Sequence, residues 1–143
     1  MKPIIPATLF ACLLIASSCN EKKQQAATPV RVETMLIDKP LDEIKQYVNG
    51  KWELTSGKNA RETCEFENTF IEFDNDRYVW TEDGQSESGI LNWRKNETSS
   101  GYEAYLMDVF YADSPSYPVA IKGDTLYIQD DTETAYRYTL VRK

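Results

Sequence analysis

The chain has 143 residues with 23 acidic and 16 basic side chains, a formal net charge of −7, and no histidine. The acidic balance argues against nucleic-acid binding, which needs clustered Lys and Arg facing the phosphates. The lack of histidine excludes hydrolases with a His base and metal sites built on imidazole. We therefore expect one domain. A binding function is favoured over an enzyme, with a carboxylate-based hydrolase as the alternative enzyme class. The sequence predicts neither a metal site nor a cofactor.

The first residues of the chain have the features of a secretory signal. Lys2 supplies a positive charge, and the apolar run over residues 4–16 is shorter than the roughly 20 residues that a transmembrane helix needs. The small residues at positions 16–18, directly before Cys19, resemble a bacterial lipobox. We therefore predict a lipoprotein signal peptide over residues 1–18 and lipidation at Cys19. A conventional signal peptide and an uncleaved anchor are the alternatives.

Lipidation at Cys19 predicts where the protein resides. Several acyl chains hold a protein on a membrane far more firmly than one chain does, so we expect a lipid-anchored protein of the bacterial cell envelope. Asn20 stands where Asp usually signals retention in the inner membrane, which favours the outer membrane. The sequence leaves open whether the domain faces the periplasm or the outside.

A polar segment and a short helix follow. Residues 19–40 are predicted to form a flexible tether, because most of them are too polar to bury a core. Residues 41–48 are predicted to form a helix, since their apolar residues share one helical face and acids occupy the first turn. Asn49-Gly50 is predicted to end this helix. Two helical turns are not stable alone, so this helix must dock on the domain.

From Lys51 onward the pattern changes to short runs of aromatic and β-branched residues separated by turn residues. Short connections favour antiparallel pairing of sequential strands, and closure of such a meander removes exposed edges. The prediction is an all-β domain over residues 41–143, an eight-stranded antiparallel up-and-down barrel with a short N-terminal helix, with a β-sandwich as the alternative. The eight runs are 51–56, 69–73, 77–81, 88–94, 102–111, 117–121, 125–129 and 134–142.

Two segments carry a resemblance to a known family. Gly50-Lys51-Trp52 resembles the G-x-W signature that opens the first strand of lipocalins, and residues 136–143 resemble the last strand of lipocalin-like domains in bacterial lipoproteins. In those proteins a lipobox, a tether, a helix and an eight-stranded barrel occur in this order. The resemblance implies a lipocalin-like barrel in which Trp52 plugs one end beneath an Arg of the last strand. Arg142 is the first candidate for that partner and Arg137 the second.

The resemblance also implies a function, namely binding or sensing a small lipophilic molecule. The alternative is a filled barrel that serves as an interaction or inhibitor module for another envelope protein. We expect a monomer, and we expect the lone Cys64 to be a small structural residue rather than a nucleophile. The candidate ligand-binding residues are the aromatic and sulfur-containing side chains Tyr78, Trp80, Trp93, Tyr105, Met107, Tyr136 and Tyr138.

Overall fold

The computed structural model describes residues 32–109 and 114–143. The predicted signal peptide, Cys19 and the first part of the predicted tether lie outside the described residues. Within the described ranges, no helix is both long enough and apolar enough to cross a membrane.

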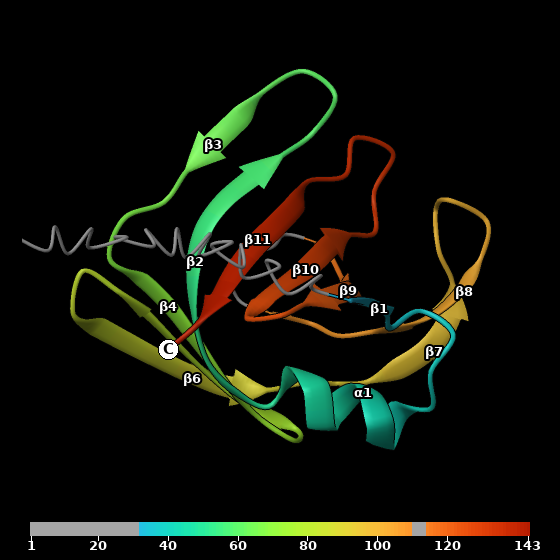
Figure 1. Cartoon of the computed structure of the whole chain (residues 1–143), viewed down its shortest axis with the longest axis horizontal. Coiled ribbons are helices and arrows are strands. Elements are labelled where there is room, and N and C mark those ends of the chain that lie inside the picture. Colours follow the sequence, from blue (N-terminus) through green and yellow to red (C-terminus); the bar gives the residue numbers. More distant parts are fainter. Residues whose placement is uncertain (1–31, 110–113) are drawn as a thin grey trace, which may run out of the picture.

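The described chain is a sheet protein with one short helix (Figure 1). The all-β prediction is confirmed, because every sheet ladder between the described strands is antiparallel. In chain order the elements are β1 (Glu33–Met35), α1 (Leu41–Val48), β2 (Gly50–Lys58), β3 (Thr63–Glu65), β4 (Thr69–Asp74), β5 (Arg77–Glu82), β6 (Gln85–Ile90), β7 (Arg94–Glu97), β8 (Glu103–Leu106), β9 (Ser116–Lys122), β10 (Thr125–Asp130) and β11 (Arg137–Arg142).

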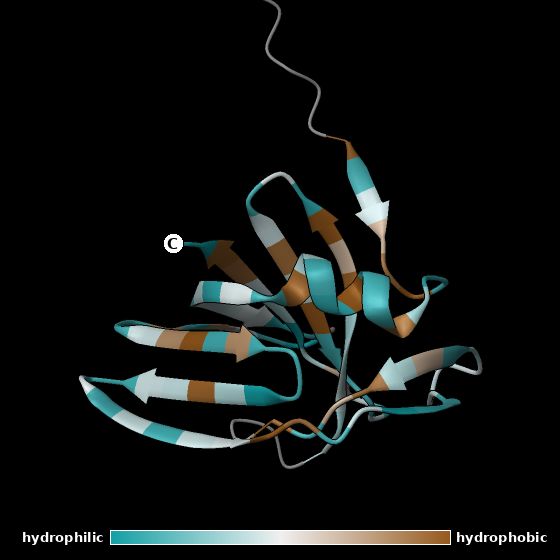
Figure 2. Cartoon of the chain, turned by 90° about the horizontal axis from the view of Figure 1, so that it is seen from below, coloured by the Kyte–Doolittle hydropathy of each residue, from teal (hydrophilic) through white to brown (hydrophobic). Residues whose placement is uncertain are grey.

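The helix α1 has the bounds that the sequence predicted. Ile44 and Val48 are its buried side chains, and both belong to the main core. Brown and teal residues alternate along α1 in Figure 2, as expected for a helix with one apolar face. The helix therefore gains its stability from docking on the sheet rather than from its own length.

The larger sheet has the order β1-β9-β10-β11-β2-β4-β5-β6, and β3 adds to β2. Strand β2 pairs with both β11 and β4, so the first and the last of the predicted runs are neighbours. The fourth predicted run is divided, since β6 pairs with β5 whereas β7 pairs with β8. Among the described residues no ladder joins the β7–β8 sheet to the larger sheet, so the hydrogen-bonded ring that a closed barrel requires is not complete.

The sequence missed two short strands. Strand β1 pairs with β9, and Leu36, directly after it, is fully buried. The predicted tether over residues 19–40 therefore ends too late, because its last residues already pack on the domain. Strand β3 pairs with the end of β2 and places Cys64 opposite Gly57. Each of these strands has three residues, too few for an alternating pattern to be recognised.

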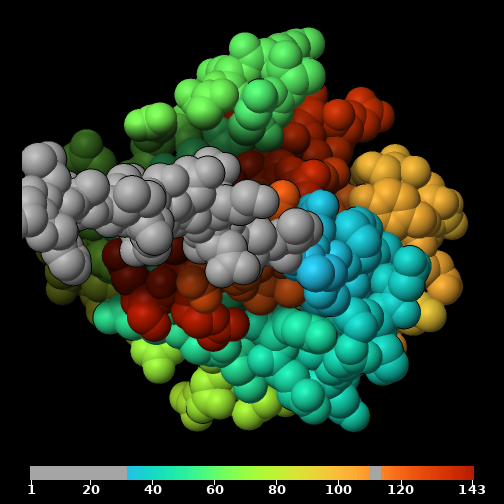
Figure 3. Space-filling model, in the orientation of Figure 1, coloured from blue at the N-terminus to red at the C-terminus, as the bar shows by residue number. Residues whose placement is uncertain are grey.

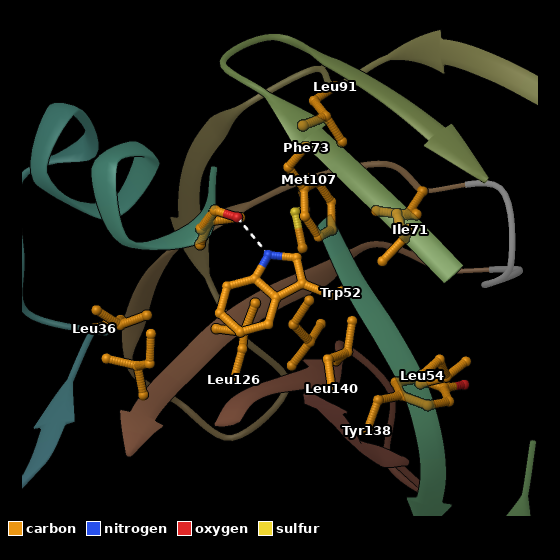
Figure 4. Packing of buried hydrophobic residues seen from close by; sticks show 14 of the residues in the cluster. Leu36, Trp52, Leu54, Ile71, Phe73, Leu91, Met107, Leu126, Tyr138 and Leu140 are labelled. Atoms are coloured by element: carbon orange, nitrogen blue, oxygen red, sulfur yellow. Dashed lines mark hydrogen bonds between the residues drawn. The ribbon is translucent and has the colours of Figure 1, made fainter. Parts of the chain in front are cut away.

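The main core fills the space between α1 and the inner face of the sheet (Figure 4). It is built from the inward-facing residues of the strands, which alternate with half-buried or exposed residues along β4 and with half-buried residues along β10. A second, smaller cluster packs β8 against the other face of β9, which explains why six of the seven β9 residues are buried. The largest fully buried side chains of the whole domain are Trp52, Tyr117, Phe73, Leu36, Ile44, Leu54, Ile71, Leu106, Met107, Leu126, Ile128 and Leu140.

Trp52 lies at the junction of helix and sheet. Its side chain is fully buried, and its indole N–H donates to the Val48 carbonyl of α1 over 2.7 Å (Figure 4). The Arg142 guanidinium lies 4.1 Å from the ring centroid, so the two residues make the contact that the sequence predicted. Arg137, the second candidate, lies over the Tyr127 ring instead, at 4.7 Å.

Arg142 also closes the end of the helix. Its two terminal nitrogens donate to the Asn49 carbonyl at 3.1 Å and the Tyr47 carbonyl at 3.0 Å, which α1 leaves without partners at its C-terminus. Gly50 makes room for this arrangement. It has φ +122°, and a Cβ there would stand 2.7 Å from the Arg142 guanidinium. The glycine and the tryptophan of the Gly50-Lys51-Trp52 motif thus both shape the site where Arg142 packs between helix and sheet.

We predict that Trp52→Ala lowers the free energy of unfolding by about 3–5 kcal/mol, because it removes the largest buried side chain of the core. Arg142→Ala should cost about 1–2 kcal/mol through the lost ring contact and carbonyl bonds. Arg137→Ala is the matched control, since this arginine stacks on a ring without bonding the helix, and it should cost less. Urea denaturation measures all three, and equal losses for the two arginine variants would contradict this account.

Candidate functional site

The two ends of the sheet differ in what covers them. One end holds α1 and the β4–β5 turn, joined by the Asn49 amide on Asn75 at 3.1 Å and by the Lys45–Asp76 ion pair at 2.7 Å. Strands β2, β5 and β10 end away from α1, where β4, β6, β9 and β11 begin. In Figure 1 the β5–β6 turn lies at the left and the β10–β11 connection at the top. We call these parts together the far end. It is the place to search for a site, because the helix does not cover it.

Three of the predicted ligand-binding residues lie near the helix instead. Tyr78 pairs across the sheet with Phe73, close to the β4–β5 turn, and Trp93 donates its indole N–H to the Asn75 carbonyl at 3.0 Å. Tyr105 lines a separate pocket of about 340 Å³ between the segment before α1 and the β7–β8 hairpin. These two parts lie side by side in Figure 3, in cyan and gold. The remaining lining residues of this pocket are Ile37, Asp38, Lys39, Pro40, Lys95 and Glu103.

The other four predicted residues divide between core and far end. Met107 is fully buried and belongs to the packed core. The far end holds Trp80 on β5, Tyr138 on β11, and Tyr136 directly before β11. The structure therefore does not collect the seven side chains in one pocket, because neighbouring strands point several of them to different ends and faces of the sheet.

Trp80 forms the floor of a surface pocket of about 290 Å³. The ring belongs to the main core, and only 6% of the residue is exposed. Glu87 stands directly opposite Trp80 on β6, and Glu82 pairs with Gln85 two positions closer to the turn. The walls of the pocket are Glu82, Asp83, Gln85 and Glu87.

The chemistry of this pocket is an aromatic surface beneath carboxylates. Such a surface attracts positive charge through the ring and through the acids. Apolar parts of a ligand gain from contact with the indole, and hydrogen-bond donors gain from the carboxylates. With the indole ring and the carboxylates together, the pocket suits a small molecule that has an apolar part and a cationic or hydrogen-bond-donating part. We call it the Trp80 pocket.

A second feature of the far end is a buried carboxylate. Asp130 accepts hydrogen bonds from the Ser116 hydroxyl at 3.0 Å and the Tyr138 hydroxyl at 3.1 Å, and only 8% of it is exposed. These bonds join β9, β10 and β11. Burial raises the pKa of Asp130, and the bonds from Ser116 and Tyr138 offset this only in part.

Aromatic rings extend this cluster towards β3. Tyr136 stacks on Tyr138 with ring centroids 6.1 Å apart, and its hydroxyl donates to Glu62. Phe66 lies 6.3 Å from Tyr138 on another side, and the Cys64 sulfur is 4.0 Å from the Tyr136 hydroxyl. Cys64 is thus half-buried within a polar and aromatic group.

Sequence reasoning missed Asp130, Ser116 and Glu62 as parts of the far end. Asp130 had a usable signal, since it continues the inward-facing positions of Leu126 and Ile128 on an alternating strand. An acid at a core position indicates a hydrogen-bonded or functional role. No such signal existed for Glu62, whose contact with Tyr136 spans 74 positions of sequence.

Comparisons with known proteins do not identify the site. No protein-family model, no curated protein and no solved structure matches this chain. Within the described residues, no group of three or more Cys, Asp or Glu side chains has a geometry that would hold a metal ion.

We predict that Asp130→Asn stabilises the protein at pH 7. The pKa of Asp130 is higher in the folded than in the unfolded chain, so ionisation opposes folding, and the wild type becomes more stable as the pH falls through the raised pKa. The advantage of the variant should therefore shrink on acidification. Thermal unfolding between pH 4 and pH 8 measures this.

The control for this prediction is Asp124→Asn in the exposed β9–β10 turn, which should change stability little at any pH. A loss of stability in Asp130→Asn at pH 7, or an advantage that is constant with pH, would show that the hydrogen bonds of the carboxylate outweigh the cost of its burial.

Proposed function

We propose that this chain is a lipid-anchored binding module of the bacterial cell envelope, which holds a small amphiphilic molecule in the Trp80 pocket. The observation that carries the proposal is the nearly buried indole ring at the floor of a pocket walled by three acids. The lipobox-like segment before Cys19 supports the anchor and the location.

The proposal includes a lipocalin-like barrel. Its support is the pairing of β2 with β11, which brings the first and last predicted strands together, and the helix over one end. In this view β6 and β7 are two halves of one bent strand, which pairs first with β5 and then with β8. A single bridge between Met107 and Ser116 joins β8 to β9 and continues the ring. The unclosed place lies beside β6, next to the Trp80 pocket.

Packing limits the ligand to a small one. The core between Trp52, Leu126 and Leu140 is filled by fully buried side chains, so a ligand has no room inside the sheet next to the helix. The pocket lined by Tyr105 lies at the surface, between the segment before α1 and the β7–β8 hairpin. The Trp80 pocket, at about 290 Å³, is at the lower limit of the roughly 300–1,000 Å³ that small-molecule sites occupy. A ligand would lie against one face of Trp80 rather than deep inside the sheet.

The same packing favours a second function, a protein-interaction module with a filled interior. In that case the aromatic side chains serve stability, and another envelope protein binds to the outside of the domain. The two functions differ in whether the Trp80 pocket takes a ligand.

The first experiment tests the pocket directly. Benzyltrimethylammonium is a suitable probe, because it combines an aromatic ring with a positive charge, and benzenesulfonate is its anionic match. We expect calorimetry and tryptophan fluorescence to detect the cation and not the anion. Glu87→Gln should weaken binding, since it removes a carboxylate opposite Trp80 and leaves the core unchanged.

Trp93→Phe is the control, as Trp93 lies near the helix end and should leave binding unaltered. Equal binding of both probes, or an unchanged affinity in Glu87→Gln, would refute the Trp80 pocket as a site for cationic amphiphiles.

A separate experiment tests the anchor. Cys19→Ser should abolish labelling by palmitate and move the protein from the detergent phase to the aqueous phase, because the acyl chains supply the membrane affinity. Cys64→Ser should change neither. Retention of Cys19→Ser on membranes would contradict anchoring through acyl chains.

A further inference from the structure

Strand β6 forms one margin of the large sheet, where Figure 1 labels it. Five of its six residues are exposed, and the sixth, Gly89, is half-buried. Within residues 32–109 and 114–143, β6 pairs with β5 and with no other strand. One row of its backbone hydrogen-bonding groups therefore points away from the sheet.

The register identifies these groups. A two-residue turn, Asp83-Gly84 with positive φ at both positions, joins the strands, so its flanking pair Glu82–Gln85 is hydrogen-bonded. Alternation along the ladder then gives non-hydrogen-bonded pairs at every second position. One of these pairs, Thr81–Ser86, has its side-chain hydroxyls 2.8 Å apart. The backbone N–H and C=O groups of Ser86, Ser88 and Ile90 consequently point outward.

This edge has little of the usual protection against pairing. Natural edge strands are shielded by proline, by charged side chains and lysine above all, by bulges or by a covering element. β6 contains neither proline nor lysine, its one charged side chain is Glu87, and its register with β5 runs without a shift. The edge is thus a regular six-residue template.

Its charge indicates the kind of segment that would bind. The β5–β6 hairpin over residues 77–90 contains three acids, namely Glu82, Asp83 and Glu87, and one base, Arg77, which stands opposite Ile90. On the opposite face Ile90 is 65% and Val79 37% exposed. A strand that alternates basic with β-branched residues would place its cations beside Glu87 and its apolar side chains beside Ile90.

We infer that the free edge of β6 binds an extended basic segment of another protein, which adds to the sheet as a further strand. Backbone hydrogen bonds to Ser86, Ser88 and Ile90 supply the affinity, and the acids select a basic sequence. A second copy of this chain is a poor occupant, because each copy has a net charge of −7. The inference does not rest on the proposed small-molecule function, although both use the acids Glu82, Asp83 and Glu87.

The experiment uses the full chain and a capped hexapeptide of alternating Lys and Val, matched to the length of β6. A peptide of alternating Glu and Val is the charge control. We expect NMR titration to detect the basic peptide only, with affinity that falls as salt rises. Amide exchange should slow at Ser86, Ser88 and Ile90, whose N–H groups the peptide would cover.

Ser88→Pro is the decisive variant. It removes an outward N–H and leaves the hydrogen bonds between β5 and β6 in place, because Ser88 is at a non-hydrogen-bonded position. The variant should lower the affinity for the basic peptide at least about tenfold, equivalent to about 1.4 kcal/mol. Ser88→Ala should bind normally. The NMR spectrum of Ser88→Pro shows whether the variant is folded, and its binding of benzyltrimethylammonium reports separately on the Trp80 pocket.

Three results would overturn the inference. The acidic peptide binds as well as the basic one, or Ser88→Pro binds the basic peptide like the wild type, or sedimentation finds a dimer that Ser88→Pro dissociates. The last result would assign the edge to a second copy.

Discussion

The contact of Trp52 with α1 and Arg142 is the constraint on which the remaining structure depends. The indole bonds the last turn of the helix, and the guanidinium covers the ring while it bonds two helix carbonyls. One group of side chains thereby joins α1, β2 and β11. Since β2 pairs on both sides, its direction fixes β11 and β4 together. The sheet curls around this corner.

This junction makes the two ends of the domain unequal. The helix end is packed and has its backbone carbonyls paired, so it contributes stability. The far end has an aromatic floor at Trp80, a buried carboxylate at Asp130 and an unshielded edge at β6. Binding features concentrate where packing is incomplete, because exposed polar groups and unpaired backbone need partners. The two proposals share the acids Glu82, Asp83 and Glu87. They differ in that the first uses the Trp80 ring and the second uses the outward backbone groups of β6, which run from the far end back towards the β4–β5 turn.

Local sequence patterns predicted much of the fold. The apolar spacing over residues 41–48 gave the exact helix, and turn residues located the β4–β5 and β5–β6 hairpins. The pairing of Arg142 with Trp52 followed from a family resemblance. The predictions that failed depend on contacts between distant parts of the chain. β1 is too short to show an alternating pattern and is defined by its pairing with β9. The fourth predicted run is divided because one half pairs with β5 and the other with β8. Seven aromatic or sulfur-containing side chains could not be assigned to one site, because both faces of several strands are apolar.

Native-state hydrogen exchange at the indole N–H groups tests the central role of the Trp52 junction most directly. Trp52 donates to a buried carbonyl, whereas Trp93 donates to an exposed one. We predict that the Trp52 N–H exchanges only through global unfolding, with a protection that falls with denaturant as steeply as global stability does. The Trp93 N–H should exchange far faster, through local fluctuations. A Trp52 N–H that exchanges as rapidly as that of Trp93 would contradict the claim that this junction holds the domain together.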